Sequence, residues 1–455
     1  MSRSSDSKDK RILILGGGLT GLSAAIELSC APVNWLLLEK EETAGGLARS
    51  DELNGYTFDK TGHWLHLQNE DIRNDIMKWT SGEMMEVKRK SCSFSRGVLT
   101  GYPFQVHLHG HEPALILECL KGLWEIKLGT RKKPAHFREF IYQNFGRGIA
   151  ENFLIPYNEK LWGVNTEDIT SEWCKGFVPV PPVENVIAGA VGADLPEMGY
   201  NVKFLYPEKG GIGELPKALL RMLPQESVLT SCPVEKVDHR KKRAYAGGEW
   251  LDYSTMISTA PLPDLADMLV APPQSVMRNS RMLRASPVVY LDVAVKPRVK
   301  MDYHWVYLPD REYPFYRVGV YSNAAPHMAP ANGSSLYVEM ADRDVSGGKN
   351  AVVQKALPAL CSMGLLDSAE DILFTRLNVI PHGYVIYDHN RRRALTSLLR
   401  FFRGQGIYSC GRYGSWIYSS MEDSILEGRR TAADALKDYD HAKRPVGCKT
   451  KQRKR

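Results

Sequence analysis

Apolar residues recur with two different spacings along this 455-residue chain. A short apolar run at 11–15 is followed by helical spacing at 22–28 and by a second apolar run at 35–38. The residues from about 69 to 175 read as mostly helical. Helical spacing is clearest at 115–128, 137–154 and 421–436, and strand-like alternation recurs at 202–206, 234–237, 256–258, 288–295, 305–308, 315–321 and 335–340. The pattern predicts an α/β fold.

Three glycines lie between the first predicted strand and the first predicted helix, at Gly16, Gly18 and Gly21. The first permits a tight turn, the second lets the backbone approach a pyrophosphate, and the third lets the helix pack closely on the strand. The helix N-terminus then presents free N–H groups to negative charge. Glu39 ends the second strand about 20 residues further on, where a carboxylate accepts ribose hydroxyls. These features together predict a dinucleotide-binding unit of the Rossmann type.

The segment after Glu39 indicates which dinucleotide is bound. Residues 39–48 read EKEETAGGLA, an acid followed by a turn with paired glycines at Gly45 and Gly46. This segment resembles the FAD-binding opening of the amine oxidase superfamily, and paired glycines allow backbone conformations that are closed to other residues. We therefore expect FAD as the cofactor. Further contacts to it are expected from Leu19, Thr20, Lys40, Leu47 and Ala48.

Composition is that of an ordinary globular protein, with 43% hydrophobic and 24% charged residues. No stretch reaches the ~18 apolar residues of a membrane-spanning helix. Eight scattered cysteines without a CxxC pair are typical of a reducing compartment, and the polar start has neither a signal nor a transit peptide, so we expect a cytoplasmic protein. Most of the formal charge of +7 lies in the C-terminal tail at 441–455, which we interpret as solvated, with no nucleic acid as partner.

Six longer motifs indicate a more specific family resemblance. They are FDKTGH at 58–63, YPFQ at 102–105, PYNEKLW at 156–162, PFYR at 314–317, HGY at 382–384 and GRYGSWIY at 411–418. Together they resemble the flavin-dependent UDP-galactopyranose mutases, especially the eukaryotic kind. In that family the reduced flavin is the nucleophile toward the anomeric carbon of a UDP-sugar, and the sugar changes ring form without net oxidation. The resemblance implies FAD, a UDP-sugar substrate and a reductant, for which NADPH is a candidate.

The resemblance also implies roles for individual residues. Substrate contacts are expected from Tyr102, Phe104, Gln105, Phe153, Asn158, Trp162, Lys175 and Asn201. Catalytic roles near the diphosphate and the flavin are expected for Arg317, Tyr307, Tyr384, Tyr418 and His63. Additional flavin contacts are expected from Gly62, His63, Val234, Gly411, Arg412, Met421, Glu422 and Ser424. Aromatic rings with an amide suit a uracil, and a guanidinium suits two phosphate oxygens.

Two positions depart from the family pattern. Where the family has a second diphosphate arginine, in an expected strand, this chain has Phe177. Lys175 would share its face of the strand, and we hypothesise that it supplies a cation instead. A family tyrosine is replaced by Ala324. Because both losses fall in the sugar-diphosphate region, an FAD-dependent oxidoreductase of the amine oxidase or protoporphyrinogen oxidase type stays open as the alternative, as does a flavin fold without turnover.

A metal site is the remaining hypothesis to weigh. His107, His109 and His111 alternate, and on a strand they would share one face. No carboxylate or cysteine joins them closely, so we predict no metal.

The expected architecture has three parts, with the substrate in the cleft between them, and the oligomeric state is left open. They are a discontinuous Rossmann-type FAD-binding domain at 8–66, 208–262 and 404–440, a mostly helical domain at 67–175, and a mixed β-sheet substrate domain at 176–207 and 263–403.

Overall fold

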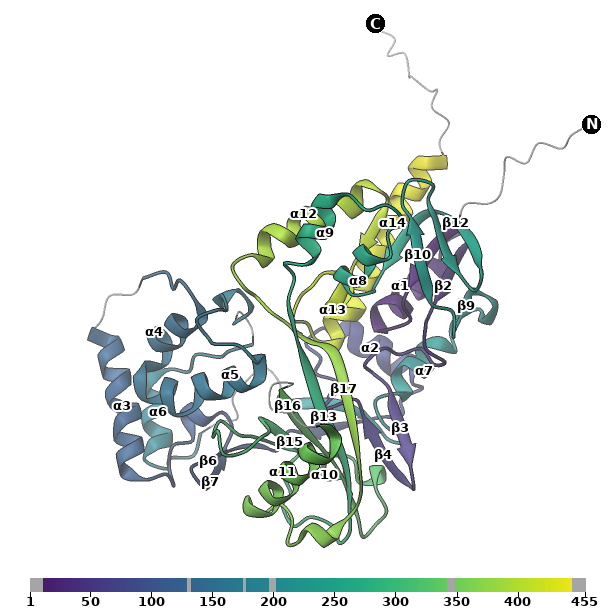
Figure 1. The fold of residues 1–455 in the computed structure, drawn as a ribbon. Helices are drawn as coiled ribbons and strands as arrows, with labels where there is room; N and C mark the ends of the chain where they lie inside the picture. The colour runs from purple at the N-terminus through teal and green to yellow at the C-terminus, as the bar shows by residue number, and fades with distance from the viewer. Residues whose placement is uncertain (1–10, 129–131, 175–176, 196–201, 342–347, 444–455) are drawn as a thin grey trace, which may run out of the picture. The chain divides into compact units, whose positions relative to one another are not determined.

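The computed structural model describes residues 11–128, 132–174, 177–195, 202–341 and 348–443. The described residues form two compact units (Figure 1). Unit 1 is formed from Met1–Leu47, Pro216–Arg281 and Ala394–Arg455, so far as these are described. Unit 2 is formed from Ala48–Leu215 and Met282–Arg393, within the same limits.

Within the described residues, unit 1 is built on a seven-stranded sheet in the order β10–β11–β12–β1–β2–β9, with β18 beside β12. The parallel strands β1 (Arg11–Leu15) and β2 (Trp35–Leu38) are almost wholly buried, as expected for strands covered on both faces. The other strands are β9 (Val228–Leu229), β10 (Val234–Asp238), β11 (Arg243–Ala246), β12 (Glu249–Ser258) and β18 (Ile407–Ser409).

Helix α1 (Leu19–Ser29) packs closely against α14 (Met421–Lys443). A Cβ atom on Gly428 would lie 2.3 Å from the carbonyl oxygen of Thr20, so the two helices touch through backbone. The remaining helices of this unit are α8 (Leu262–Asp267), α9 (Gln274–Ser280) and α13 (Gly411–Gly414), while α7 (Glu214–Leu220) and α12 (Arg391–Gly404) span the division between the units.

Unit 2 contains a second seven-stranded sheet among the described residues, in the order β17–β13–β16–β15–β14–β6–β7. Its strands are β6 (Ser91–Ser95), β7 (Val98–Gly101), β13 (Ala285–Val295), β14 (Trp305–Tyr307), β15 (Arg317–Val320), β16 (Ser334–Ala341) and β17 (Ile372–Val385). Alternate residues point to opposite faces. One face is apolar, contains Val306, Val318 and Val338, and packs with α11 (Gly348–Ser362). The opposite face presents the polar and aromatic residues described below.

The remaining elements of unit 2 are helices and two small antiparallel sheets. The helices are α2 (Glu70–Trp79), α3 (Pro113–Leu128), α4 (Phe137–Ile149), a π-helix (Ala150–Leu154), α5 (Ile155–Trp162), α6 (Val183–Ala190) and α10 (Tyr321–Ala324). The small sheets pair β3 (Ser50–Leu53) with β4 (Tyr56–Asp59), and β5 (Met84–Lys88) with β8 (Lys203–Pro207). Figure 1 shows α3, α4, α5 and α6 gathered as one helical group.

The prediction of a mostly helical region from 69 to 175 was wrong for residues 84–101. These residues form β5, β6 and β7, and β6 pairs with β14, more than 200 residues later in the chain, so a distant partner decides its conformation. The units also group the chain differently from the expected division. Residues 48–66 lie in unit 2, where Asp59 accepts hydrogen bonds from Tyr206 and Ile212.

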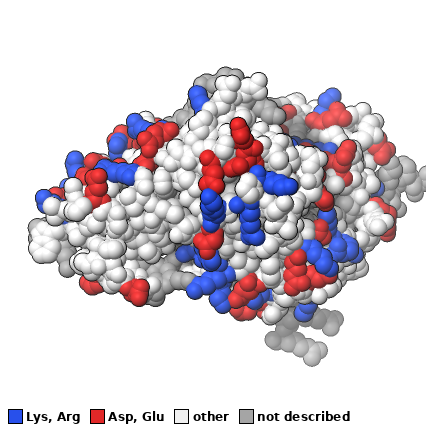
Figure 2. All heavy atoms as spheres, turned by 90° about the horizontal axis from the view of Figure 1, so that it is seen from below, with Lys and Arg blue, Asp and Glu red and all other residues white. Residues whose placement is uncertain are grey.

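The surface carries charges of both signs. On the face shown in Figure 2, Lys and Arg lie interspersed with Asp and Glu. Of the helices that the structure describes, none combines the length and the apolar character needed to span a bilayer.

Candidate active site

The glycine-rich turn of unit 1 leaves backbone exposed at the N-terminus of α1. Gly16 has a φ of +94°, and a Cβ atom there would lie 2.3 Å from Thr259 Oγ1. Gly18 precedes the helix, whose first amides lack intrahelical acceptors. A Cβ on Gly18 would meet, among the described residues within 4 Å, only the Gly46 Cα at 3.8 Å. The turn therefore fits a pyrophosphate, which needs close backbone approach and N–H donors.

Glu39 ties this turn to the end of β2. Its buried carboxylate accepts a hydrogen bond from the Gly17 amide at 2.6 Å and one from the Glu41 amide at 2.9 Å. An ionised carboxylate has about four acceptor positions, so two remain for hydroxyl groups. The contact to a ribose stays a prediction. The structure adds that Glu39 also shapes the turn.

A second segment of unit 1 approaches the same helix. Gly411 has a φ of +78°, and a Cβ atom there would lie 2.7 Å from Thr20 Oγ1. Arg412 donates a hydrogen bond to the carbonyl of Ser419 at 2.8 Å, and its guanidinium carbon lies 4.9 Å from the centre of the Tyr418 ring. The structure thus brings Gly411 to α1 and groups Arg412 with Tyr418.

The other predicted cofactor residues are placed as follows, and their roles stay predictions. Gly21 packs against the carbonyl of Gly16, and the Gly45 amide donates to Gly17 at 2.7 Å. Leu19 and Thr20 open α1, Lys40 is exposed beside Glu41, Leu47 lies in unit 1, Ala48 is buried in unit 2, Val234 opens β10, and Met421, Glu422 and Ser424 form the first turn of α14.

Polar residues form one row across the sheet of unit 2. Ser93, Tyr307, Arg317 and Glu339 lie at matching positions on β6, β14, β15 and β16. Arg317 donates to both carboxylate oxygens of Glu339, from Nε at 3.0 Å and from Nη2 at 2.7 Å. Glu339 is fully buried and the Arg317 side chain is 20% exposed. Burial opposes the charge of Arg317, but Glu339 and the surrounding phenols hold its pKa well above the usual value.

This buried ion pair keeps a permanent cation on the sheet. A guanidinium has five N–H donors, of which the two contacts with Glu339 engage two. The other donors are chemically able to bind phosphate oxygens. The row can therefore bind an anion while Glu339 maintains the orientation of the arginine.

An aromatic wall borders the row. The ring centres of Tyr102 and Tyr307 lie 4.7 Å apart, and those of Tyr157 and Tyr307 lie 5.5 Å apart. Phe104 stacks on Phe153 at 4.6 Å, and Phe153 on Tyr157 at 5.7 Å. The expected uridine residues are thus joined to the expected diphosphate residue Tyr307. Burial raises the pKa of Tyr157 well above its usual value, so its phenol is a neutral donor.

The remaining substrate candidates of unit 2 lie on the same elements. Asn158 is buried on α5 and donates to the Leu154 carbonyl at 2.7 Å. Gln105 is buried in a short 3-10 helix at Phe104–Val106. Trp162 packs edge-on against Tyr384 at 5.5 Å.

The loop with Gly62 and His63 follows β4 and is anchored at Asp59. This buried carboxyl accepts hydrogen bonds from Ser50 Oγ and Tyr206 Oη, both at 2.6 Å. Burial raises the pKa of Asp59 to about 7. A Cβ atom on Gly62 would lie only 2.3 Å from the hydroxyl oxygen of Tyr337, so only glycine fits at this position.

One local prediction was wrong, and two residues cannot be placed. The amides of Phe177 and Val178 both donate to the Cys174 carbonyl, so Phe177 lies in a turn and not in a strand. The strand spacing that was used to propose Lys175 as a replacement cation therefore does not apply at Phe177. Lys175 and Asn201 lie outside the described residues. Ala324 is buried at the end of α10.

Among the residues of these clusters that were not predicted as site residues are Glu339, Tyr157 and Asp59. A signal for Glu339 is present, since it is the one charged residue in an otherwise apolar and small-residue strand, SSLYVEMA. Tyr157 and Asp59 lie inside quoted motifs, but no local sequence pattern distinguishes them from the other residues of those motifs.

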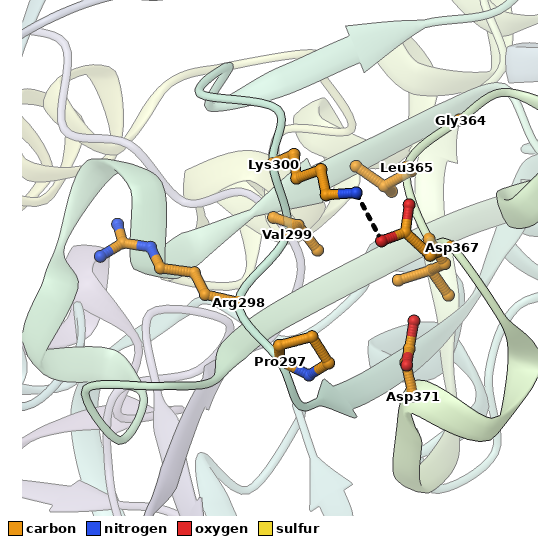
Figure 3. A pocket seen from close by; sticks show the side chains of 9 residues that line it. Pro297, Arg298, Val299, Lys300, Gly364, Leu365, Asp367 and Asp371 are labelled. Carbon is orange, nitrogen blue, oxygen red and sulfur yellow. Dashed lines mark ion pairs between the residues drawn. The ribbon is translucent and has the colours of Figure 1, made fainter.

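Other groupings of polar residues do not compete with these clusters. Among the described residues, no three His, Cys, Asp or Glu side chains gather as metal ligands. His107 contacts the Pro103 carbonyl at 2.9 Å, and His111 packs on Phe104. Figure 3 shows a surface pocket in which Lys300 is paired with Asp367 at 2.7 Å, and both side chains are largely exposed, so water screens their charges.

Comparison with protein families and curated proteins adds two findings. The model of the family of flavin containing amine oxidoreductases matches residues 132–436, and that of NAD(P)-binding Rossmann-like domains matches residues 14–78. The probable flavin-containing monoamine oxidase A of Dictyostelium discoideum is 39% identical over 54 residues. That match covers 12% of this chain and 12% of the relative.

Solved structures match over nearly the whole chain. A crystal structure of reduced UDP-galactopyranose mutase is 28% identical, with a TM-score of 0.88 over 94% of each chain. A putative protoporphyrinogen oxidase from Exiguobacterium sp. 255-15 is 15% identical, with a TM-score of 0.73 over 96% of this chain and 100% of that one. The second likeness concerns the fold alone.

Proposed function

The chain belongs to the family of flavin containing amine oxidoreductases, and we propose that within it this protein isomerises a UDP-sugar in the manner of a UDP-galactopyranose mutase. Its cofactor is FAD, and the resemblance to the mutases seen in the motifs is confirmed by the fold. When FAD is bound and reduced, it supplies the nucleophile for such a reaction. The residues of the chain would bind the UDP-sugar and stabilise the departing diphosphate.

The observation that carries the proposal is the buried pair of Arg317 and Glu339 beside Tyr307 and the aromatic wall. A diphosphate needs a fixed cation with several donors, and a uracil needs aromatic faces with an amide nearby. The proposal is supported by such groups on one sheet face (Arg317 and Tyr307), on the neighbouring α5 (Asn158) and in the short 3-10 helix at Phe104–Val106. An amine substrate is itself a cation and has no use for a buried guanidinium.

The residues support departure of the diphosphate in two ways. Arg317 holds its charge at all working pH values, because Glu339 keeps its pKa high. We expect Tyr307 and Tyr384 to add O–H donors to the oxygens on which charge develops. The rings of Phe104 and Phe153 are buried and stack on one another, so they provide an apolar, low-dielectric surface next to Tyr157 of the aromatic wall, where electrostatic interactions are stronger.

An FAD-dependent oxidoreductase is the second candidate. It is favoured by the matching family model and by the monoamine oxidase among the relatives. An oxidoreductase begins its cycle with oxidised flavin and consumes an electron acceptor with each turnover. A mutase-like isomerase works only in the reduced state and consumes no reductant in proportion to product.

The test is product formation from UDP-sugars, with UDP-galactopyranose first. One arm is anaerobic with dithionite, the other aerobic without it, and both are followed by chromatography with an oxygen electrode alongside. We expect an isomer in the reduced arm only, without matching oxygen uptake. Oxygen consumption in proportion to turnover of an amine, with no isomer from any UDP-sugar, would favour the oxidoreductase.

A further inference from the structure

We infer that Lys160 is a positioning residue that fixes the two strands carrying Tyr307 and Arg317, an inference that rests on the proposed binding of UDP by those residues. Lys160 lies on α5 and is only 6% exposed. Its ammonium donates to three backbone carbonyls, those of Leu308 at 3.0 Å, Asp310 at 3.0 Å and Phe315 at 2.6 Å.

These carbonyls belong to both limbs of the turn between β14 and β15. Leu308 follows Tyr307 directly, and Phe315 precedes Arg317 by two residues. An ammonium has three N–H donors, which matches the three carbonyls that it meets here. A buried charge is costly unless hydrogen bonds compensate it, and a buried carbonyl is costly without a donor. Ammonium and turn therefore stabilise each other, and the position of one limits the position of the other.

The helix that supplies this ammonium also carries residues that are expected to contact the substrate. Asn158 and Trp162, two of the expected substrate residues, lie two positions before and after Lys160 on α5. The lysine thus connects the helix of the uridine half to the hairpin of the diphosphate half. We infer that it sets the distance between the groups that meet the base and those that meet the phosphates.

A second contact fixes the far side of the same turn. The carboxylate of Asp310 accepts a hydrogen bond from the Arg96 amide at 2.6 Å and one from Ser95 Oγ at 3.3 Å. Arg311 also meets Glu159 of α5, but at 3.8 Å and with an arginine side chain that is 83% exposed. Exposed pairs of this kind contribute little, so Arg311 provides a matched control on the same turn and the same helix.

The experiment compares UDP affinity, by calorimetry, among holoenzyme variants. Lys160→Met keeps the length of the side chain and removes the charge and the donors. We expect its dissociation constant for UDP to rise by roughly tenfold or more. Lys160→Arg keeps a cation with several donors and should restore part of the affinity. Arg311→Met should bind UDP like the wild type. If Lys160→Met does not fold, Lys160→Gln, which retains two donors, takes its place.

A double-variant comparison separates positioning from general stability. If Lys160 acts through the hairpin, Lys160→Met should weaken UDP binding far less in an Arg317→Ala background than in the wild type. Equal fold-changes in both backgrounds, or a lower melting temperature with unchanged UDP affinity, would overturn the inference.

Hydrogen exchange of residues 305–317 distinguishes failure of this inference from failure of the proposed function. Faster exchange there in Lys160→Met than in Arg311→Met supports the role of Lys160, and equal exchange contradicts it. A wild type that does not bind UDP at all refutes the proposed function, and Lys160 is then judged by exchange alone.

Discussion

The candidate sites of unit 1 and unit 2 are built from different parts of the polypeptide. In unit 1 the groups are backbone amides at the start of α1, brought together within a few residues of sequence. In unit 2 they are side chains from separate strands of one sheet, with Arg317 and Glu339 at the centre. A backbone site is disturbed by added volume, whereas a side-chain site is disturbed by lost charge or lost donors.

The role of acidic residues differs in the same way. Glu39 accepts hydrogen bonds from two backbone amides and so shapes a turn. Glu339 pairs with a guanidinium and so orients a side chain. The comparison predicts which substitutions prevent binding of the cofactor and which weaken binding of the substrate.

The largest effect is expected from Gly18→Val. The valine side chain would project from the turn where backbone must meet the pyrophosphate, so the purified variant should lose most of its bound FAD. The measurement is flavin absorbance per protein chain. Gly404→Val is a matched control in unit 1, because a Cβ there meets no described atom within 4 Å. Equal FAD content in both variants and the wild type would show that the cofactor does not approach Gly18.

The next largest effect is expected from Arg317→Ala in unit 2. Loss of a charge-assisted pair to phosphate should cost ~1.5–3 kcal/mol of binding free energy. This corresponds to a UDP dissociation constant that is roughly ten- to hundredfold higher. FAD content should stay unchanged. Calorimetry with UDP measures the first and absorbance the second.

Arg317→Ala also leaves Glu339 buried without its partner, which destabilises the fold. The double variant Arg317→Ala with Glu339→Gln removes that penalty and is the control. If the double variant binds UDP as tightly as the wild type, the diphosphate is bound elsewhere.

The sequence predicted the local features well. The strand, turn, helix and strand at 11–38 appear as expected, because their pattern lies within one contiguous segment. The strand-like alternation at 288–295 and the helical spacing at 421–436 are likewise confirmed, by β13 and α14, which both extend beyond the predicted bounds. FAD followed from the paired glycines at Gly45 and Gly46, and this prediction is confirmed by the family.

Features that depend on distant partners could not be predicted. Residues 84–101 have short alternations whose strand partners come from far along the chain. Lys160 reads as an ordinary surface lysine of a helix, and only the carbonyls of the β14–β15 turn explain its burial. The significance of Glu339 depends on its register opposite Arg317, which no local pattern contains.

The smallest of these effects is a pH dependence that originates in unit 2. Burial raises the pKa of Asp59 from 3.8 in the unfolded chain to about 7 in the folded protein. Between these values the native state holds a proton that the unfolded chain has lost, so the free energy of unfolding falls as the pH rises through this window. Desolvation of the carboxyl outweighs the hydrogen bonds from Ser50 and Tyr206, which lower the pKa, so burial decides the sign of this pH dependence. Asp59→Asn should flatten the dependence, whereas Asp302→Asn, at an exposed pair with Lys90, should not. Denaturant unfolding across this pH range measures all three proteins, and parallel profiles for Asp59→Asn and the wild type would show that this carboxyl is ionised throughout.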